Sequence, residues 1–363
     1  MRLIGKITGQ IHLLLCLYTA LAYALSYWAV GFHWSVGFIT LSIPLLWVIH
    51  LAIVILGLLS GSRKTAFVSL LMLLLAFPLW SRTFRLGSGE KSGEGEFSIL
   101  SYNVHQLGVG VNVDRNEKSL ISTEGLAFLK EVNPDLLCLQ EAFQESGGKA
   151  DLVKSLKRLG YTHFAFMGSD INEKKARQGG LAVFSKYKLE NLRHEVFAGQ
   201  NGVMKVDVRI GKNKITLIDV HLHSMTLSLR DLVEQREVDG LKNESKKTLS
   251  RMKNGFQKRN QQVAALENWI SESENPVIVC GDFNEIPYHY AYGRLSKILA
   301  NSFEKGGKGF GFTFRNLPYF IRIDNQFYDP DKIELVHFET IRSVVFSDHR
   351  PLLGSYTLLS GTE

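Results

Sequence analysis

The sequence has little cysteine, and its first 89 residues contain no aspartate or glutamate. Only three cysteines occur among 363 residues. Cys16 lies in an apolar N-terminal run, and Cys138 and Cys280 lie within short apolar runs typical of core strands. Cysteines in such positions are predicted to be small buried residues, which excludes a disulfide framework and a cysteine-built zinc site. The cysteine content leaves the redox compartment open.

The missing acidic residues change the meaning of the overall basic charge. The formal net charge is +7, with 42 basic and 35 acidic residues. Six of the basic residues lie before residue 90: Arg2, Lys6, Arg63, Lys64, Arg82 and Arg85. Removing these six from the 42 leaves 36 basic against 35 acidic residues, so the rest of the chain is near neutral at +1. A global electrostatic funnel for a polyanion such as nucleic acid is therefore excluded.

Long uncharged apolar runs lie near the N-terminus. Residues 10–30 and 36–59 carry no formal charge, and each is long enough to cross a hydrocarbon core of about 30 Å as a helix. Residues 65–81 are shorter, and they form either a third span or an interfacial or re-entrant helix. The pattern predicts a membrane domain over residues 1–85 with three transmembrane helices, at 10–30, 36–59 and 65–81.

The flanking charges predict the orientation of these helices. Basic residues precede the first segment and lie between the second and third, whereas the loop at 31–35 has no lysine or arginine. The positive-inside rule then places the N-terminus in the cytoplasm. We expect an integral protein of a bacterial-type inner or plasma membrane, with three spans and an extracytoplasmic catalytic domain. Arg82 and Arg85 weaken this orientation, and a cleaved signal peptide ending near Ala22-Tyr23-Ala24 is the alternative.

Two histidines, His12 and His50, lie inside the apolar segments. A functional intramembrane histidine is one interpretation. The favoured prediction places both near helix ends, facing the lipid headgroups.

A flexible linker and a large layered domain follow the apolar segments. Residues 86–96 are rich in Gly, Ser and charge, and such a linker reaches about 18 Å, so the domain that follows is expected to stay close to the bilayer. Short apolar runs predict strands at 97–103, 135–140, 163–167, 180–185, 203–210, 214–221, 276–281, 321–327 and 351–357. Amphipathic stretches predict helices at 118–132, 147–159 and 258–272. This mixture is typical of an α/β layered domain.

Polar side chains end several of the predicted strands. Asn103 ends one apolar run, Glu141 ends another, and Asp282-Phe-Asn284 follows a third. Near the C-terminus stands Ser347-Asp348-His349, where the Asp can orient an imidazole or hold a metal. Carboxylates and amides at strand ends are typical of a metallo-hydrolase, and hard oxygen ligands select Mg²⁺ or Mn²⁺ over a thiolate metal.

Six motifs occur in the order of a known family: Ser-Tyr-Asn103, Leu-Gln-Glu141, Val-His221-Leu-His223, Gly-Asp282-Phe-Asn284, Arg-Ile-Asp324 and Ser-Asp348-His349. At these residues the chain resembles the endonuclease/exonuclease/phosphatase family, whose best-known fold is that of deoxyribonuclease I. The resemblance covers residues 97–358, the expected catalytic domain. It implies a four-layer sandwich in which two packed β-sheets are flanked by helices on both outer faces.

The resemblance also implies roles for the metal-side residues. Glu141 corresponds to the family's principal Mg²⁺ ligand, with Asn103 beside it. Asp348 is implied as a metal-side or phosphate-side partner of His349. His349 in turn activates water or stabilises the phosphoryl group.

The remaining motif residues are implied to act on the nucleophile, the phosphate and the leaving group. Asp282 participates in nucleophile activation, and Asn284 holds a phosphate oxygen. His221 acts as an acid towards the leaving group and is oriented by Asp324 in a second His–carboxylate pair. The sequence leaves the identity of the general base open. Arg177, which precedes a Gly-Gly strand entry, either contacts phosphate or belongs to a tight turn.

Two features depart from, or add to, the family pattern. Asn325 and Gln326 follow Asp324 where the family often has Tyr and an apolar residue, which puts substrate contacts in doubt. The stretch 224–257 is longer than an ordinary connection and rich in lysine and arginine. It is either a solvated helix face or a basic arm that touches anionic headgroups or a nucleic-acid backbone.

The expected function is a membrane-anchored, Mg²⁺-dependent phosphoesterase acting on a phosphodiester or phosphomonoester. The substrate stays open between a nucleic acid and a phospholipid headgroup, as in sphingomyelinase-like enzymes. The lipid bilayer is the other expected partner, and the sequence gives no evidence of a protein partner. The alternative is a catalytically silent membrane scaffold that uses the fold to bind a partner.

Overall fold

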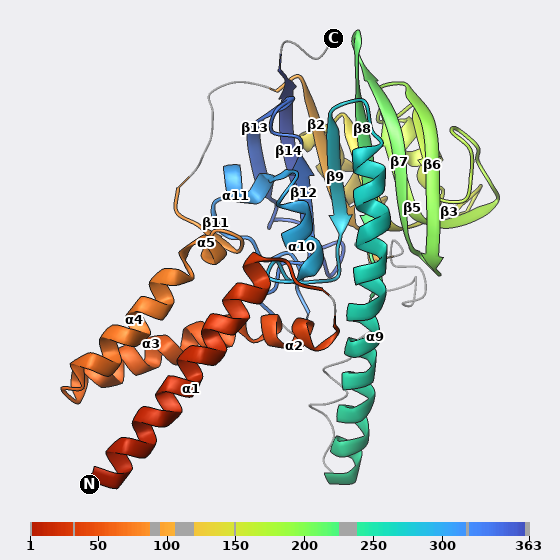
Figure 1. Ribbon diagram of the computed structural model, residues 1–363. Helices are drawn as coiled ribbons and strands as arrows, with labels where there is room; N and C mark the ends of the chain where they lie inside the picture. Colours follow the sequence, from red (N-terminus) through yellow and green to blue (C-terminus); the bar gives the residue numbers. More distant parts are fainter. Residues whose placement is uncertain are drawn as a thin grey trace.

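The computed structural model describes residues 2–31, 33–87, 95–105, 120–148, 150–224, 238–316 and 319–359. Two six-stranded sheets form the body of the molecule, and a group of helices from the N-terminus extends away from it (Figure 1). A short pairing of β1 (Phe84–Arg85) with β11 (Gly309–Phe310) joins the end of the helical region to the body.

Each six-stranded sheet mixes parallel and antiparallel strands. The first has the order β10 (Ala300–Asn301), β12 (Asp324–Tyr328), β9 (Val277–Asp282), β8 (Asn213–His221), β7 (Asn201–Ile210) and β6 (Leu189–Ala198). The second has the order β13 (Ile333–Thr340), β14 (Leu352–Leu358), β2 (Phe97–Asn103), β3 (Leu136–Glu145), β5 (Arg177–Ser185) and β4 (His163–Phe166). The central pairs β8–β9 and β2–β3 are parallel, and the other pairs are antiparallel.

The main core lies between the two sheets, because alternate residues of each strand point to opposite faces. Ile99 of β2 and Cys138 of β3 meet Leu217 of β8 and Cys280 of β9 in one cluster of buried apolar side chains. Burying a large apolar side chain contributes about 1.5–3 kcal/mol, so this layer supplies much of the stability.

Helices cover the outer face of each sheet. On the second sheet, α6 (Thr123–Val132) and α7 (Leu152–Lys157) pack over β2, β3 and β5 through a second apolar cluster. On the first sheet, α9 (Val238–Ser271) and α10 (Tyr290–Leu295) pack over β8 and β9 through a third. A last short helix, α11 (Ser302–Gly306), lies beside β13. The predicted α/β class with two sheets flanked by helices is therefore confirmed.

The N-terminal region forms α1 (Arg2–Tyr27), α2 (Ser35–Leu41), α3 (Ile43–Leu59), α4 (Arg63–Leu75) and α5 (Phe77–Trp80). Among the described residues, Thr8–Tyr27 and Ser35–Leu59 are long and apolar enough to cross a membrane, although a core helix or a signal sequence has the same properties. The expected third span at 65–81 is instead divided between α4 and α5, with the break at Ala76. At 1.5 Å per residue, α4 is about 20 Å long, shorter than a hydrocarbon core. The orientation that depends on a third span stays a prediction.

The prediction that His50 faces the headgroups is wrong. Its side chain is fully buried between helices, with its ring nitrogens 2.9 Å from Thr19 Oγ1 and 3.1 Å from Ser69 Oγ. His12 joins the same polar group, 2.9 Å from Ser69 Oγ. A buried imidazole needs hydrogen-bond partners, and the neighbouring helices supply them from hydroxyl groups.

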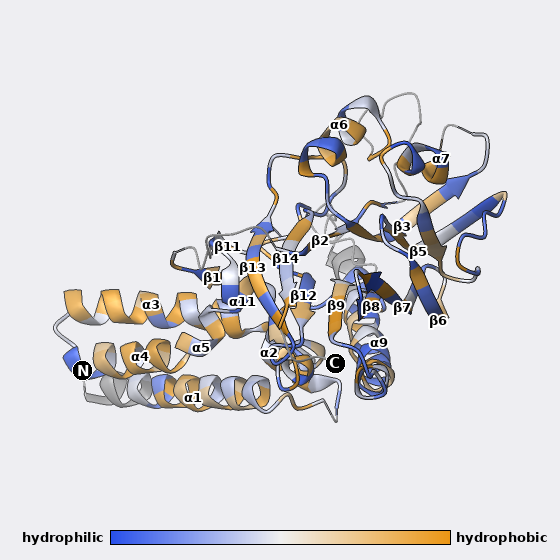
Figure 2. Cartoon of the chain, turned by 90° about the horizontal axis from the view of Figure 1, so that it is seen from above, coloured by the Kyte–Doolittle hydropathy of each residue, from blue (hydrophilic) through white to orange (hydrophobic). Residues whose placement is uncertain are grey.

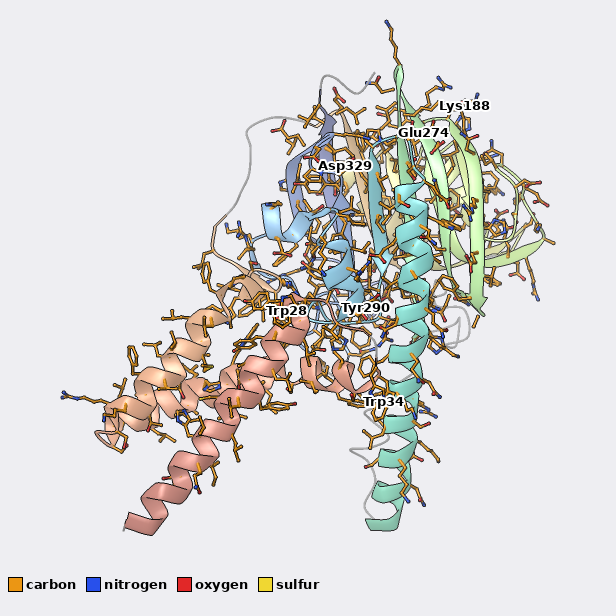
Figure 3. The ribbon with its side chains drawn as sticks, in the orientation of Figure 1. Trp28, Trp34, Lys188, Glu274, Tyr290 and Asp329 are labelled. Carbon is orange, nitrogen blue, oxygen red and sulfur yellow. The ribbon has the colours of Figure 1, made fainter. Side chains whose placement is uncertain are left out.

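The body formed by the two sheets is packed directly against the ends of the N-terminal helices. Ile286 and Tyr288 are buried in a cluster with residues of α1, α3 and α5, and the Tyr288 ring lies 5.3 Å from that of Trp47. Arg82 donates to the carbonyl of Pro287 at 2.9 Å. In Figure 3, Trp28 and Tyr290 lie together at this junction, which we call the seam.

Some elements differ from the sequence-based expectations. The sequence pattern does not predict β6 or β13, and α9 begins at residue 238 rather than 258. Residues 88–94 of the expected linker and residues 225–237 of the long basic stretch lie outside the described part of the chain. The remainder of that basic stretch belongs to α9.

Candidate functional site

One end of the space between the sheets collects most of the predicted site residues. Alternate residues of a strand point to the same face, and Ile99 and Cys280 point into the core between the sheets. Asn103 lies four residues after Ile99, and Asp282 lies two residues after Cys280, so both point to the same inner face. The ladders then set three neighbours side by side, because His221 pairs with Asp282 and Asp282 pairs with Asp324. The ends of β2, β8 and β9 and the start of β12 therefore form one polar edge.

Glu141 reaches this edge through a β-bulge. Odd-numbered residues of β3, such as Leu137 and Leu139, pack under the outer helices, so a regular strand would turn Glu141 away from the other sheet. The register between β3 and β5 shifts between Leu139 and Ala142, and Glu141 has a left-handed φ of 52°. The extra residue re-aims the side chain, as bulges near functional sites often do.

The Asn103 amide lies between two carboxylates. Its nitrogen donates to Asp282 Oδ2 at 3.0 Å and to Glu141 Oε1 at 3.3 Å. Its oxygen accepts from the His105 backbone N–H at 3.1 Å. His221 faces the same carboxylates, with Nε2 3.7 Å from Asp282 Oδ2 and 3.9 Å from Glu141 Oε1. Both ring nitrogens of this buried histidine lack a hydrogen-bond partner among the described residues.

The observed His–carboxylate pair differs from the expected one. The resemblance implies that Asp324 orients His221, but the two Asp324 oxygens lie 2.9 and 3.1 Å from Nδ1 of His349. Asp324 opens β12 directly beside the loop that carries His349, so it lies within reach of that ring. The other ring nitrogen, His349 Nε2, faces Asp282 Oδ2 at 3.8 Å. Asp324, His349 and Asp282 thus form one buried chain of alternating charge.

This chain sets the protonation states of its members. Burial alone would lower the pKa of His349, but the carboxylates of Asp324 and Asp282 outweigh it and raise the pKa to about 10. Burial and the neighbouring Asp324 raise the pKa of Asp282 to about 6, against the opposing effect of His349 and His221. At neutral pH the His349 ring is therefore an imidazolium that can donate from Nε2.

Asp348 does not contact the ring of its neighbour His349 but points to the opposite side of the site. Asp348 Oδ1 lies 3.6 Å from His105 Nδ1, and Glu141 Oε2 lies 3.8 Å from the same nitrogen. Sequence reasoning missed His105, which has a left-handed φ of 46°. Its position two residues after Asn103, in the same motif, was the available signal.

The two residues expected to bind phosphate lie in different places. Asn284 adjoins the cluster: its backbone N–H donates to Asp282 Oδ1 at 2.8 Å, and its side-chain nitrogen donates to the Leu222 carbonyl at 3.0 Å. Arg177 lies outside the cluster and forms an ion pair with Glu145. Glu145 is four residues beyond Glu141, or about 13 Å along an extended strand. The structure therefore does not bring Arg177 together with the other site residues.

The two residues that depart from the family pattern are structural. Asn325 and Gln326 are fully buried. The Gln326 amide donates to the carbonyl of Leu352 at 2.9 Å and accepts from the hydroxyl of Tyr356 at 2.8 Å, both on β14 of the opposite sheet. Gln326 therefore links the two sheets below the site. Because it is fully buried, its departure from the family pattern does not affect contacts with the substrate.

The donor set fits a hard divalent cation. Glu141 and Asp348 are partly exposed carboxylates, at 22% and 21% of their side-chain surface, that face a common point beside His105. Deeper in, ligand atoms of Asp282, Asp324 and His349 all lie within 4.8 Å of one another. Carboxylate and amide oxygens without a thiol are the ligands that Mg²⁺ and Mn²⁺ prefer.

Comparisons with known proteins agree with this architecture. Residues 123–349 match the Endonuclease/Exonuclease/phosphatase family. Residues 5–83, which contain the N-terminal helices, match a domain of unknown function. No curated protein matches the chain at a significant level.

Several solved structures are similar to this chain at low identity. The endonuclease/exonuclease/phosphatase from Bacteroides vulgatus is 15% identical, with 72% of this chain and 99% of that chain covered and a TM-score of 0.52. The catalytic domain of human Nocturnin is 16% identical (72% and 94% covered, TM-score 0.49). D. rerio TDP2, solved with a single-strand DNA product, is 19% identical (72% and 98% covered, TM-score 0.49). Because the family match spans more than half of the 363 residues, the chain belongs to the endonuclease/exonuclease/phosphatase family.

Proposed function

We propose that this protein is a membrane-anchored, metal-dependent phosphoesterase. One observation carries the proposal: Asn103, Glu141, His221, Asp282 and Asp324 come from five strands of two sheets and converge on one edge, where His349 joins them. Four carboxylates and three imidazoles lie within hydrogen-bond or ion-pair range of one another. Bringing so many ionisable groups together away from water costs free energy, and a bound cation and an anionic substrate would offset that cost.

The proposed roles follow from protonation and from free hydrogen-bonding positions. The His349 imidazolium, held by Asp324, donates to a phosphoryl oxygen and stabilises the charge that develops there. Asp282, whose pKa is raised to about 6, accepts the proton of the attacking water. His221, with no hydrogen-bond partner on either ring nitrogen among the described residues, serves as the acid towards the leaving oxygen. Asn284 positions the phosphate.

Glu141, Asn103 and Asp348 are the proposed ligands of Mg²⁺, and the same oxygen donors also accept Mn²⁺. When bound, the ion supplies positive charge to the phosphate oxygens. Glu141 and Asp348 lie on the exposed side of the site, with the buried Asn103 beside them, so both the ion and the substrate would enter from there.

Apolar surface supports the anchoring of the protein in a membrane. On α1, α3 and α4 many large apolar side chains are exposed, including Leu14 at 66%, Leu56 at 63% and Leu59 at 81%. Figure 2 shows hydrophobic colour along most of α3 and α4 and along parts of α1. Soluble proteins rarely expose continuous apolar patches of more than a few hundred Å², so a lipid environment accounts for this surface.

The position of the seam favours a substrate at the bilayer surface. The segment that carries Asp282 and Asn284 continues directly into Ile286 and Tyr288, which pack on the helix ends. The proposed anchor and the site are therefore a few residues apart. Lys246, Lys247 and Lys258 are exposed on α9, and Lys253 lies over the Trp34 ring at 5.1 Å, below the body in Figure 3. Such a basic helix beside an anchor suits anionic headgroups, so we favour a phospholipid headgroup over a nucleic acid.

The test uses the full chain in detergent micelles and in proteoliposomes. Bis-p-nitrophenyl phosphate, plasmid DNA and phospholipid vesicles are each assayed with Mg²⁺ or EDTA, for the wild type and for His349→Ala. We expect Mg²⁺-dependent turnover, highest on vesicles, and a loss of at least ~100-fold in the variant. Higher turnover on DNA would retain the phosphoesterase and replace the lipid substrate. Equal turnover by wild type and variant would contradict the proposed site.

A further inference from the structure

A second cluster of metal-binding side chains lies among the N-terminal helices, far in sequence from the phosphoesterase residues. His12 and Cys16 come from α1 and His50 comes from α3, and one ligand atom of each lies within 4.8 Å of the others. His12 and Cys16 are four residues apart, so they share one helix face. Cys16 Sγ lies 3.6 Å from His12 Nε2.

The hydrogen bonds around His50 determine which of its nitrogens carries the proton. The Thr19 hydroxyl donates to the Leu15 carbonyl at 2.8 Å, so its oxygen is left to accept from His50 Nε2 at 2.9 Å. In the neutral ring, Nδ1 is then unprotonated and its lone pair points away from Thr19, towards Ser69. Metal-binding histidines likewise donate the N–H of their other ring nitrogen to an acceptor that fixes the tautomer and the orientation of the ring, and Thr19 Oγ1 is such an acceptor for His50.

The lone pair of His50 Nδ1 and the Nε2 atom of His12 point at the same place. Ser69 Oγ from α4 lies 3.1 Å from the first and 2.9 Å from the second. Metal–nitrogen bonds of about 2.0 Å and metal–sulfur bonds of about 2.3 Å put neighbouring nitrogen and sulfur ligands about 3.5–3.7 Å apart. The observed distance from His12 Nε2 to Cys16 Sγ agrees with this spacing.

The low-polarity surroundings select the charge of the ion. Thr19, His50 and Ser69 are fully buried, and Cys16 is 7% exposed. Two neutral imidazoles and one thiolate carry one negative charge, so a monovalent cation gives a neutral site, whereas a divalent cation leaves a net positive charge that is costly away from water. A thiolate with two imidazoles is a donor set that copper accepts well.

We propose that His12, Cys16 and His50 form a site for a monovalent copper ion, with Ser69 Oγ as a weak fourth donor and Thr19 as the group that orients His50. The site is independent of the phosphoesterase proposal, and neither depends on the other. It would join α1, α3 and α4 at one point of the N-terminal helices.

The experiment measures copper bound to the full chain in detergent micelles. Cu⁺ is supplied under reducing conditions against a competing chelator, and bound metal is counted for the wild type, Cys16→Ser, His50→Ala and the control His33→Ala. His33 is a histidine of the same region whose ring bonds Ser35 outside the cluster. We expect about one equivalent in the wild type and the control, and a loss of at least ~10-fold in affinity in the other two variants. Binding that is equal in the wild type and Cys16→Ser would overturn the site.

Two further measurements keep the proposal testable if a variant fails to fold. X-ray absorption at the copper edge of the loaded wild type is expected to show one sulfur and two nitrogen neighbours, and a spectrum without sulfur would overturn the assignment. A parallel titration with Zn²⁺ tests the charge argument. Stoichiometric Zn²⁺ binding that displaces Cu⁺ would contradict the preference for a monovalent ion.

Discussion

His349 illustrates how a few neighbours set the chemistry of one residue. Its ring is 5% exposed and lies between Asp324 on Nδ1 and Asp282 on Nε2. A buried imidazole without carboxylates would be neutral, and the two carboxylates reverse that preference. The side chain is thereby suited to donate a hydrogen bond at neutral pH rather than to remove a proton.

Replacing Asp324 should lower the pKa of His349. The wild-type pKa is raised to about 10, and we expect Asp324→Asn to lower it by roughly 1–3 units. Because the folded pKa is raised, the interaction stabilises the fold fully below the unfolded value of about 6.5, and this contribution is lost as the pH rises through about 10. NMR titration of the imidazole in metal-free buffer measures the shift. Asp331→Asn, an exposed carboxylate of the same domain, is the control, and an unchanged pKa in Asp324→Asn would contradict the pairing.

The proposed role of Glu141 depends on the β-bulge that directs its side chain into the site as well as on its negative charge. Deleting Glu141 would restore a regular register between β3 and β5, but it would also remove one of the four carboxylates of the site. The isosteric change Glu141→Gln keeps the bulge and removes one charge from the proposed metal ligands. We expect a ~10–100-fold weaker response to Mg²⁺ in turnover assays, with unfolding unchanged. A variant with the wild-type Mg²⁺ dependence would exclude Glu141 as a ligand.

At the scale of elements, the parallel pair β8–β9 holds the centre of the site. Gly281 has a φ of 133°, and a Cβ atom there would collide with the Val220 carbonyl oxygen. The close approach of the two backbones sets His221 opposite Asp282. No side chain larger than hydrogen fits at this point.

Gly281→Ala should therefore destabilise the domain strongly. Backbone clash and an unfavourable φ together are expected to lower the free energy of unfolding by more than ~3 kcal/mol. Gly211→Ala is a matched control, because Gly211 also has a positive φ, of 59°, but a Cβ atom there would meet nothing within 4 Å. That control is expected to cost about 1–2 kcal/mol. Denaturant midpoints of both variants test the difference, and equal midpoints would refute the close approach.

Asp151, at the N-terminus of α7 and away from the site, makes a contribution to stability that depends on pH. Burial alone would raise the pKa of Asp151, but hydrogen bonds from the Gly147 backbone, Gln144, Lys174 and the Lys154 backbone lower it below its usual range. Its contribution to stability is thus present above the unfolded pKa of about 3.9 and is lost as the pH falls through the folded value.

Asp151→Ala is expected to reduce the free energy of unfolding at pH 7 by about 1–2 kcal/mol, through loss of the helix cap and the ion pair with Lys174. The difference from the wild type should narrow below about pH 4, where the Asp151 carboxyl begins to protonate in the unfolded chain while it stays ionised in the folded protein. Thermal unfolding of both proteins at pH 7 and pH 3.5 measures this. A difference that stayed constant with pH would contradict a charge-based contribution from Asp151.

The sequence predicted the central strands and their polar ends because both follow simple rules. Buried strands read as apolar runs, and period two then places Asn103 and Asp282 on the inner face. The strand β6 was missed because its side chains are mostly exposed, so it lacks an apolar run. The bulge at Glu141 and the pairing of Asp324 with His349 depend on contacts between distant segments, which no local pattern records.

At the scale of the whole molecule, the seam joins two regions that the sequence separates by an expected flexible linker. Residues 82–85 are already fixed to the body, through Arg82 and the pairing of β1 with β11. The linker composition could not predict this, because the contacts join distant parts of the chain: Arg82 and its partner Pro287 lie 205 positions apart. The neighbouring Ile286 and Tyr288 contact the helices across a similar separation.

Tyr288→Ala should loosen the seam and reduce turnover, although Tyr288 contacts none of the proposed site residues. The ring packs against Trp47, and the hydroxyl lies 2.5 Å from Thr83 Oγ1. Removing it is expected to cost about 3–5 kcal/mol in stability and to lower kcat through displacement of the adjoining residues 282–285. Val196→Ala on the exposed edge strand β6 is the control. Unchanged turnover in a folded Tyr288→Ala protein would show that the seam does not position the site.

The central claim is that the polar edge between the sheets hydrolyses a phosphate ester with the help of a divalent cation. The most direct test is the release of p-nitrophenol from bis-p-nitrophenyl phosphate by the purified full chain, first with EDTA and then with Mg²⁺ restored. We expect no turnover with EDTA, recovery with Mg²⁺, and no recovery in His349→Ala. Turnover that persists with EDTA, or that His349→Ala retains in full, would contradict the claim.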